Sequence, residues 1–157
     1  MIQWDCLSLG PVFAERHILQ PMTELTKRHY ETLAAWRYAL RRFLQFSQEA
    51  AKGAAIPPQQ HQALLVIKGA PGRDFATVGD IAERLLLKHH SAVGLVDRLV
   101  SRQLVQREVS TADRRRIEVR LTPKGEALVE RLSAAHLREL RQLRPELKRL
   151  LEAVGGE

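Results

Sequence analysis

The stretch from Thr111 to Gly125 crowds positive charge around a single aspartate: Asp113 is followed at once by Arg114, Arg115 and Arg116. Three adjacent like charges repel one another, so a bare solvated loop explains them less well than a polyanionic partner does. Guanidinium groups bind phosphate oxygens through paired hydrogen bonds, and they enter the narrow minor groove of DNA, where the potential is most negative. We therefore expect all three arginines to contact DNA.

The charge of the whole chain supports the same partner. The 157 residues carry a formal charge of +7, and residues 84–124 alone hold ten basic and four acidic side chains, a net +6. Residues 1–83 are net +1 and residues 125–157 are neutral. A basic patch confined to about a quarter of the chain is typical of nucleic-acid binding and predicts double-stranded DNA as the partner.

The sequence argues against an enzyme and implies no cofactor. It contains no phosphate-binding glycine loop, no Cys/His metal spacing and no nucleophile motif. His89 and His90 are adjacent, so on a helix their side chains point about 100° apart and do not share a metal. We expect at least one of them to contact DNA instead. A protein-interaction module is a further alternative, which the +6 segment makes less favourable.

The N-terminal residues predict a cytoplasmic protein. Cys6 is the only cysteine, so no internal disulfide forms, and a peroxide-sensing thiol is disfavoured because the neighbouring Asp5 opposes ionisation of the thiol. No apolar run approaches the roughly 18–20 residues of a membrane span. The first 20 residues also lack the basic start and apolar block of a signal peptide.

Apolar periodicity predicts two helices in the first half of the chain. A long helix from about Met22 to Ala51 is followed by a second from Pro57 or Pro58 to about Gly69. The length of the first helix suggests that it packs against a partner as well as its own core, with Trp36, Phe43 and Phe46 in a core. One face is expected to hold Leu33, Trp36, Leu40, Phe43 and Leu44.

The next segment predicts a helix-turn-helix. Thr77 and Asp80 form a capping pattern ahead of a buried stripe of Val78, Ile81, Ala82 and Leu85. A break at Leu86 and Leu87 precedes a helix whose inner stripe is Val93, Val96, Leu99 and Val100. The other side of this helix holds His89, His90, Ser91, Gly94 and Arg98.

After Gln103 the period of apolar residues falls to about two, which predicts a hairpin of residues 104–109 and 116–121. Ile117, Val119 and Leu121 are expected to face the core, and Arg116, Glu118 and Arg120 to face outward. Thr122 and Pro123 begin another helix that continues to about Leu143, and Pro145 begins a separate final helix. The fold class is therefore mainly α, a winged helix-turn-helix with a small β-hairpin wing and a helical dimerisation domain.

Three motifs resemble the MarR (multiple-antibiotic-resistance regulator) family. They are "TVGDIAERL", "SAVGLVDRLVSRQLVQR" and the wing pattern Asp-x-Arg followed by Leu-Thr-x-x-Gly, matched at Asp113, Arg115, Leu121, Thr122 and Gly125. The chain departs from the family at three positions: Lys88 replaces the usual Ser or Thr at the start of the recognition helix, and Leu86 and Gln103 replace glycines. A left-handed backbone at Gln103 is expected to be strained without glycine.

The resemblance implies a homodimeric transcription regulator, most often a repressor of a pseudo-palindromic operator that a small aromatic or phenolic ligand releases. Residues 1–55 and 126–157 would form the dimerisation region and residues 56–125 the DNA-binding domain. Asp113 would orient an arginine of the wing, and Arg115 or Arg114 would enter the minor groove. A carboxylate-binding cleft lined by Tyr38, Arg41 and His61 is a further hypothesis, and a non-specific architectural DNA-binding protein remains the alternative. The predicted DNA-contacting residues are Lys88, His89, His90, Ser91, Gly94, Arg98, Arg114, Arg115 and Arg116.

Overall fold

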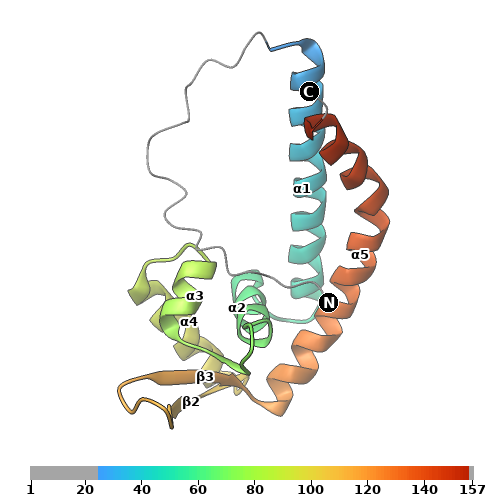
Figure 1. Ribbon diagram of the computed structural model, residues 1–157. Helices are drawn as coiled ribbons and strands as arrows, with labels where there is room; N and C mark the ends of the chain where they lie inside the picture. Colours follow the sequence, from blue (N-terminus) through green and yellow to red (C-terminus); the bar gives the residue numbers. More distant parts are fainter. Residues whose placement is uncertain (1–24, 156–157) are drawn as a thin grey trace.

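A computed structural model describes residues 25–155 of the chain (Figure 1). Cys6, the expected helix start at Met22 and the expected absence of a signal peptide lie outside the described residues. No helix within this range is long and apolar enough to cross a membrane. The elements in chain order are α1 (Lys27–Gly53), α2 (Pro58–Lys68), β1 (Phe75–Ala76), α3 (Val78–Arg84), α4 (His89–Ser101), β2 (Val105–Val109), β3 (Ile117–Leu121) and α5 (Pro123–Gly155).

The helices begin where local capping chemistry places them. Pro58 occupies the first turn of α2, where its missing N–H leaves no hydrogen bond unmade. At α3 the predicted capping box is confirmed: the Asp80 N–H donates to Thr77 Oγ1 at 3.1 Å, and the Thr77 N–H donates to Asp80 Oδ2 at 2.7 Å. Both contacts are made within three residues, which explains why the sequence alone predicts them.

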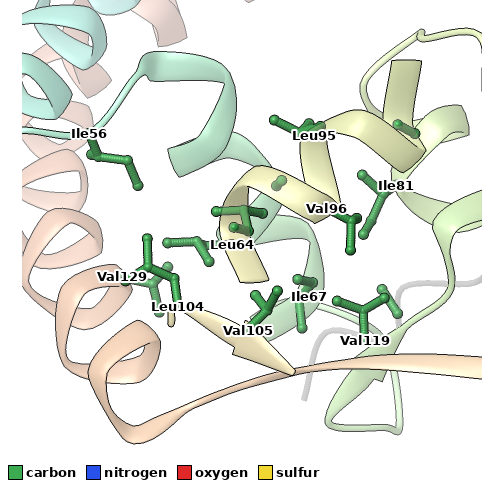
Figure 2. Close-up of a cluster of buried hydrophobic side chains, with 14 of the residues drawn as sticks. Ile56, Leu64, Ile67, Ile81, Leu95, Val96, Leu104, Val105, Val119 and Val129 are labelled. Carbon is green, nitrogen blue, oxygen red and sulfur yellow. The ribbon is translucent and has the colours of Figure 1, made fainter. Parts of the chain in front are cut away.

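The core lies between α2, the helix-turn-helix and the inner face of the wing (Figure 2). Side chains from all of these elements meet there, and Val129 of α5 closes one side. The amphipathic stripes therefore hold α3 and α4 in a fixed relation to the hairpin. The largest fully buried aliphatic side chains are Ile56, Leu64, Ile67, Ile81, Leu95, Leu99, Val96, Val119 and Val129.

The strands form one antiparallel sheet in the order β1-β3-β2. The predicted hairpin is confirmed, with β2 and β3 paired from Val105 opposite Leu121 to Val109 opposite Ile117. The short strand β1 was not predicted, because two residues carry no periodicity, yet it pairs Phe75 with Arg120 and attaches the sheet to α3. Figure 1 shows the hairpin projecting away from the helices.

Three burial predictions in this region are wrong. Ile117 is 41% exposed because it lies at the distal end of the hairpin, beyond the core. Glu118, expected outside, is only 7% exposed because Ser110 and Arg120 cover its carboxylate. Val100 is 37% exposed, and Ala92 and Leu95 take the inner positions of α4 together with Val96 and Leu99. The stripe on α4 is thus rotated from the predicted one.

The long helices α1 and α5 lie alongside each other (Figure 1). Ala39 of α1 and Leu143 of α5 are buried, and the rings of Phe43 and Phe46 lie edge-on to that of His136. The predicted apolar face of α1 divides in two: Trp36 and Phe43 are half-buried, whereas three leucines form an exposed stripe. That stripe is Leu33, Leu40 and Leu44, each about half exposed.

A separate final helix after Pro145 was wrongly predicted, because α5 continues through the proline to Gly155. An internal proline removes one helical hydrogen bond and bends the axis, and Figure 1 shows the end of α5 turning toward α1. Packing on either side of Pro145 offsets its cost: Leu143 is buried, and Glu146 pairs with Arg42 of α1 at 3.2 Å.

Candidate nucleic-acid interface

Helix α4 presents the predicted DNA-contacting residues on its outer side. Lys88 precedes the helix as its N-cap residue, and its side chain makes no capping hydrogen bond. Ser91 and Gly94 are half-buried. A methyl group added at Gly94 would meet only the Arg98 guanidinium, at 3.6 Å, so the backbone here is open to close approach. The exposed members of the set are Lys88, His89, His90 and Arg98.

Both ends of α4 are flanked by residues with a left-handed backbone. Leu86 in the turn before the helix has φ 53° and is 80% exposed, and Gln103 after it has φ 59°. Neither residue is glycine, so each conformation is strained, as expected for Gln103. The turn is held by the Leu87 N–H, which donates to the Ala82 carbonyl oxygen at 2.8 Å. The helix-turn-helix geometry is therefore formed despite the missing glycines.

The Leu-Thr-x-x-Gly motif fixes the base of the wing to the end of α4. The Thr122 N–H donates to the Leu104 carbonyl oxygen at 3.1 Å, and its hydroxyl donates to the Gln103 carbonyl oxygen at 2.8 Å. The Gly125 N–H donates back to Thr122 Oγ1 at 3.1 Å. Lys124 Nζ adds a bond to the Arg102 carbonyl oxygen at 3.0 Å. The wing, α4 and α5 therefore meet in one hydrogen-bonded junction.

At the tip of the wing, Asp113 organises the arginine loop. Its Oδ1 accepts a hydrogen bond from the Arg115 backbone N–H at 3.0 Å, and its Oδ2 pairs with Arg116 Nε at 3.5 Å. Its backbone carbonyl accepts from the Arg116 N–H at 2.9 Å. Arg114, Arg115 and Arg116 are all exposed. The aspartate thus shapes the loop backbone and pairs with one guanidinium, while three cationic side chains point into solvent.

The wing and the helix-turn-helix enclose a groove of about 530 Å³. Arg115 and Arg116 line it from the wing and His89 from the start of α4, so the structure brings these three predicted residues together. Arg73, which was not predicted, adds a fourth basic side chain. A basic residue seven positions before the Asp80 capping carboxylate is the sequence feature that would have indicated it. The complete lining is Arg73, Thr77, Val78, Gly79, Asp80, His89, Arg115, Arg116 and Ile117.

The acidic groups near the groove are already neutralised by partners. Burial alone would raise the pKa of Asp80, but hydrogen bonds from Thr77 and the Arg73 guanidinium at 2.7 Å outweigh it, and the pKa is lowered. The Ser110 hydroxyl lowers the pKa of Glu118 most strongly, and Arg120 adds to the effect. Both carboxylates stay ionised at neutral pH, each against an arginine. The free charge on this face is therefore positive.

The three residues of the hypothetical ligand cleft have different environments. Tyr38 is 61% exposed, with the Arg42 guanidinium 5.7 Å from its ring centroid, and Arg41 is also exposed. His61 is 2% exposed, and its ring lies 4.9 Å from that of His136. Neither ring nitrogen of His61 has a hydrogen-bond partner among the described residues. Burial and the neighbouring His136 lower the pKa of His61.

These features define a winged helix-turn-helix protein with a long helical extension. Residues 56–116 match the model of the MarR family. Over 67 residues the chain is 28% identical to an uncharacterised helix-turn-helix transcriptional regulator, YsmB of Bacillus subtilis, and this alignment spans 43% of the chain and 46% of the relative. The match in sequence is thus confined to less than half of either protein.

Solved structures extend the likeness to most of the chain. A MarR family protein from Bacillus stearothermophilus is 25% identical, with 76% of this chain and 82% of the other covered and a TM-score of 0.65. AbsC, a MarR family transcriptional regulator from Streptomyces coelicolor, is 17% identical, with 80% and 84% covered and a TM-score of 0.65. A mutant of MepR from S. aureus, solved bound to an oligodeoxyribonucleotide, is 23% identical, with 83% and 99% covered and a TM-score of 0.59. Residues 56–116 therefore resemble the MarR family in sequence, and the fold of the chain is that of these solved MarR family structures.

Proposed function

We propose that this protein is a sequence-specific DNA-binding regulator, acting as a homodimeric repressor on a pseudo-palindromic operator in the cytoplasm. The observation that carries the proposal is the groove in which Arg115 and Arg116 of the wing lie beside His89 of α4. A duplex that accepts α4 in its major groove would pass the wing along its backbone, where Arg115 or Arg114 enters the minor groove. A structurally similar protein, the MepR mutant from S. aureus, was solved bound to an oligodeoxyribonucleotide, which supports DNA as the partner.

The first test is selection of bound sequences from a random duplex pool at roughly physiological salt. We expect a pseudo-palindromic motif whose half-sites lie about one helical turn apart, bound about 10³–10⁷-fold more tightly than random DNA. Binding without an enriched motif, at an affinity that collapses as salt rises, would contradict specific regulation. That outcome would favour the alternative of a non-specific architectural protein.

The second test is the substitution Arg115→Ala. We expect weaker binding to the selected duplex and a salt slope reduced by about one, because one phosphate-directed cation is lost. Arg131→Ala is the matched control, since Arg131 is an exposed arginine on α5, away from the groove. Equal binding of Arg115→Ala and the parent at several salt concentrations would show that Arg115 is not a wing residue that contacts DNA.

The proposed dimer uses α1 and the C-terminal half of α5, which correspond to the dimerisation region of residues 1–55 and 126–157. The support is the amount of apolar surface that these helices expose. Leu33 and Leu40 of α1 are 54% and 51% exposed, and Leu151 and Val154 of α5 are 61% and 63% exposed. Burying such stripes between two copies would remove them from water. The homodimer would then carry two copies of the DNA-binding domain of residues 56–125.

We further propose that a small aromatic or phenolic acid releases the DNA, with Tyr38, Arg41 and His61 as candidate contacts. The unpartnered ring nitrogens of the buried His61 support this site, because buried polar atoms normally have partners. The test is titration of benzoate, salicylate and 4-hydroxybenzoate into the protein bound to its selected duplex. Release that is lost in His61→Leu would support the site, and release that is unchanged in this variant would place the ligand elsewhere.

A further inference from the structure

The wing is joined to the helix-turn-helix through an aromatic ring between two arginines. Phe75 of β1 pairs with Arg120 of β3, so their side chains lie on the same face of the sheet. The Arg120 guanidinium carbon lies 4.8 Å from the centroid of the Phe75 ring, and the Arg73 guanidinium carbon lies 5.1 Å from it. Both distances are within the range of cation–π attraction.

Each of these guanidinium groups is in turn held by carboxylates. Arg73 Nη2 pairs with Asp80 at 2.7 Å, which links it to the N-terminal cap of α3. Arg120 pairs with Glu118 at 2.6 Å and with Glu108 of β2 at 3.0 Å. The contacts therefore run without interruption from α3, across β1 and β3, to the outer strand β2. We call Arg73, Phe75, Glu108, Glu118 and Arg120 the wing-base network.

Apart from the ion pair between Arg107 of β2 and Asp97 of α4 at 2.7 Å, the distal part of the hairpin has little other support from the described body of the protein. Only two residue pairs join β1 to β3, and both are near the base of the wing. Farther out, Val109 and Ile117 face each other and are 59% and 41% exposed, so no core side chain covers them. The tip carries three arginines that repel one another. The direction of the wing tip therefore depends on contacts at the base of the hairpin.

We propose that Phe75 and Arg120 are positioning residues that fix the angle of the wing relative to α3 and α4. The inference rests on the proposed function, in which Arg115 and α4 engage one duplex at the same time. A wing already held at the binding angle loses less conformational freedom when DNA binds. Phe75 and Arg120 thus act on DNA affinity through the arginines of the tip, without touching DNA themselves.

The substitution Phe75→Leu tests this role without changing the charge of the protein. It keeps an apolar side chain on β1 and removes both cation–π contacts. We expect the affinity for the selected duplex to fall about 5- to 30-fold, as for the loss of two exposed cation–π contacts. The salt slope is expected to stay that of the parent, because every cation is retained. Phe75→Trp restores the aromatic face and is expected to restore the affinity.

A measurement on the free protein separates this inference from the proposed function. Hydrogen exchange of the hairpin amides, including the Ser110 N–H bonded to the Arg116 carbonyl oxygen, is expected to quicken in Phe75→Leu. The amides of α1 and α5 should exchange as in the parent. If the parent shows no specific DNA binding, the proposed function fails, yet the exchange data still decide whether Phe75 holds the wing.

Arg120→Lys is the second variant, in case Phe75→Leu loses its fold. Lysine keeps the charge but loses the planar group that stacks on Phe75 and pairs with two carboxylates. We expect the same faster exchange and weaker DNA binding. Unchanged exchange in the folded variants, faster exchange with unchanged affinity, or an altered salt slope would each overturn the proposal.

Discussion

The substitution Gly125→Ala is expected to weaken the junction between the wing, α4 and α5. Gly125 is the third residue of α5, and its N–H is bonded to Thr122 Oγ1. A Cβ atom built at this position would overlap the Leu104 carbonyl oxygen and lie 3.0 Å from the carbonyl carbon. The obstacle is main chain just before β2, so no side-chain rotation relieves it. The first turn of α5 must move away from Leu104, which also bonds Thr122.

The size of the effect follows from two opposing contributions. Alanine in a helix is favoured over glycine by up to about 1 kcal/mol, whereas overpacking against a fixed neighbour costs about 1–3 kcal/mol or more. Because this neighbour is backbone, we expect the steric contribution to dominate and the free energy of unfolding to fall by about 1–3 kcal/mol. For a chain of this size that corresponds to a decrease in melting temperature of about 3–10 °C.

Two other helical glycines provide matched controls for Gly125→Ala. At both Gly79 of α3 and Gly94 of α4 the nearest atom to an added methyl group is a side-chain atom 3.6 Å away. Gly79→Ala and Gly94→Ala are therefore expected to raise the melting temperature slightly through helix propensity. Calorimetry or thermal circular dichroism of the three variants measures this. A melting temperature of Gly125→Ala equal to that of the parent, or losses of similar size in all three variants, would refute the steric argument.

Three further predictions concern stability and assembly. Gln103→Gly relieves the left-handed backbone at φ 59° and is expected to raise the free energy of unfolding by about 0.5–1 kcal/mol in urea titrations; a destabilised variant would contradict the strain. The pKa of His61 is lowered in the fold, so the unfolded chain binds the extra proton first. The free energy of unfolding should fall as pH drops below about 6.5, by at most about 1.4 kcal/mol per pH unit for this group. In His61→Leu this part of the pH dependence should be lost. An unchanged pH dependence in the variant would exclude His61 as its source. Leu40→Glu places a charge in the proposed dimer interface and is expected to give monomers in sedimentation experiments. The control Leu65→Glu, on the exposed side of α2, should remain dimeric. A dimeric Leu40→Glu would show that the interface lies elsewhere.

The parts of the structure that the sequence predicts best are set by neighbours along the chain. Thr77 and Asp80 are three residues apart, and apolar and polar residue types alternate over the five residues of β3, so local rules suffice for the cap and for the presence of the hairpin, but not for the burial of Ile117 and Glu118. The arginine loop and Asp113 are likewise adjacent in sequence. The residues of the candidate interface are therefore largely predictable from the sequence.

The parts that the sequence did not predict depend on partners that are distant along the chain. Whether Pro145 ends a helix depends on how much packing α1 supplies on either side of it. The burial of Glu118 depends on Ser110 and on Arg120, and nothing in a two-residue periodicity indicates a covered carboxylate. The pairing of His61 with His136 joins α2 to α5 across 75 positions, and neither residue stands in a motif that indicates the other.

Helix α5 continues from the wing junction to Gly155 as one helix, so a small rotation at the junction produces a larger displacement at the far end of the helix. From Pro123 to Arg144, before the internal proline, the helix is about 33 Å long. Because its first turn is bonded to Leu104 and Thr122, a tilt of about 5° at that junction displaces the far end by about 3 Å, by the geometry of a rigid rod of that length. The reverse also holds: a small sideways shift where α5 lies against α1 becomes a rotation of the wing and α4. We therefore expect an event that separates or tightens the two long helices to change the orientation of the candidate DNA-binding surface.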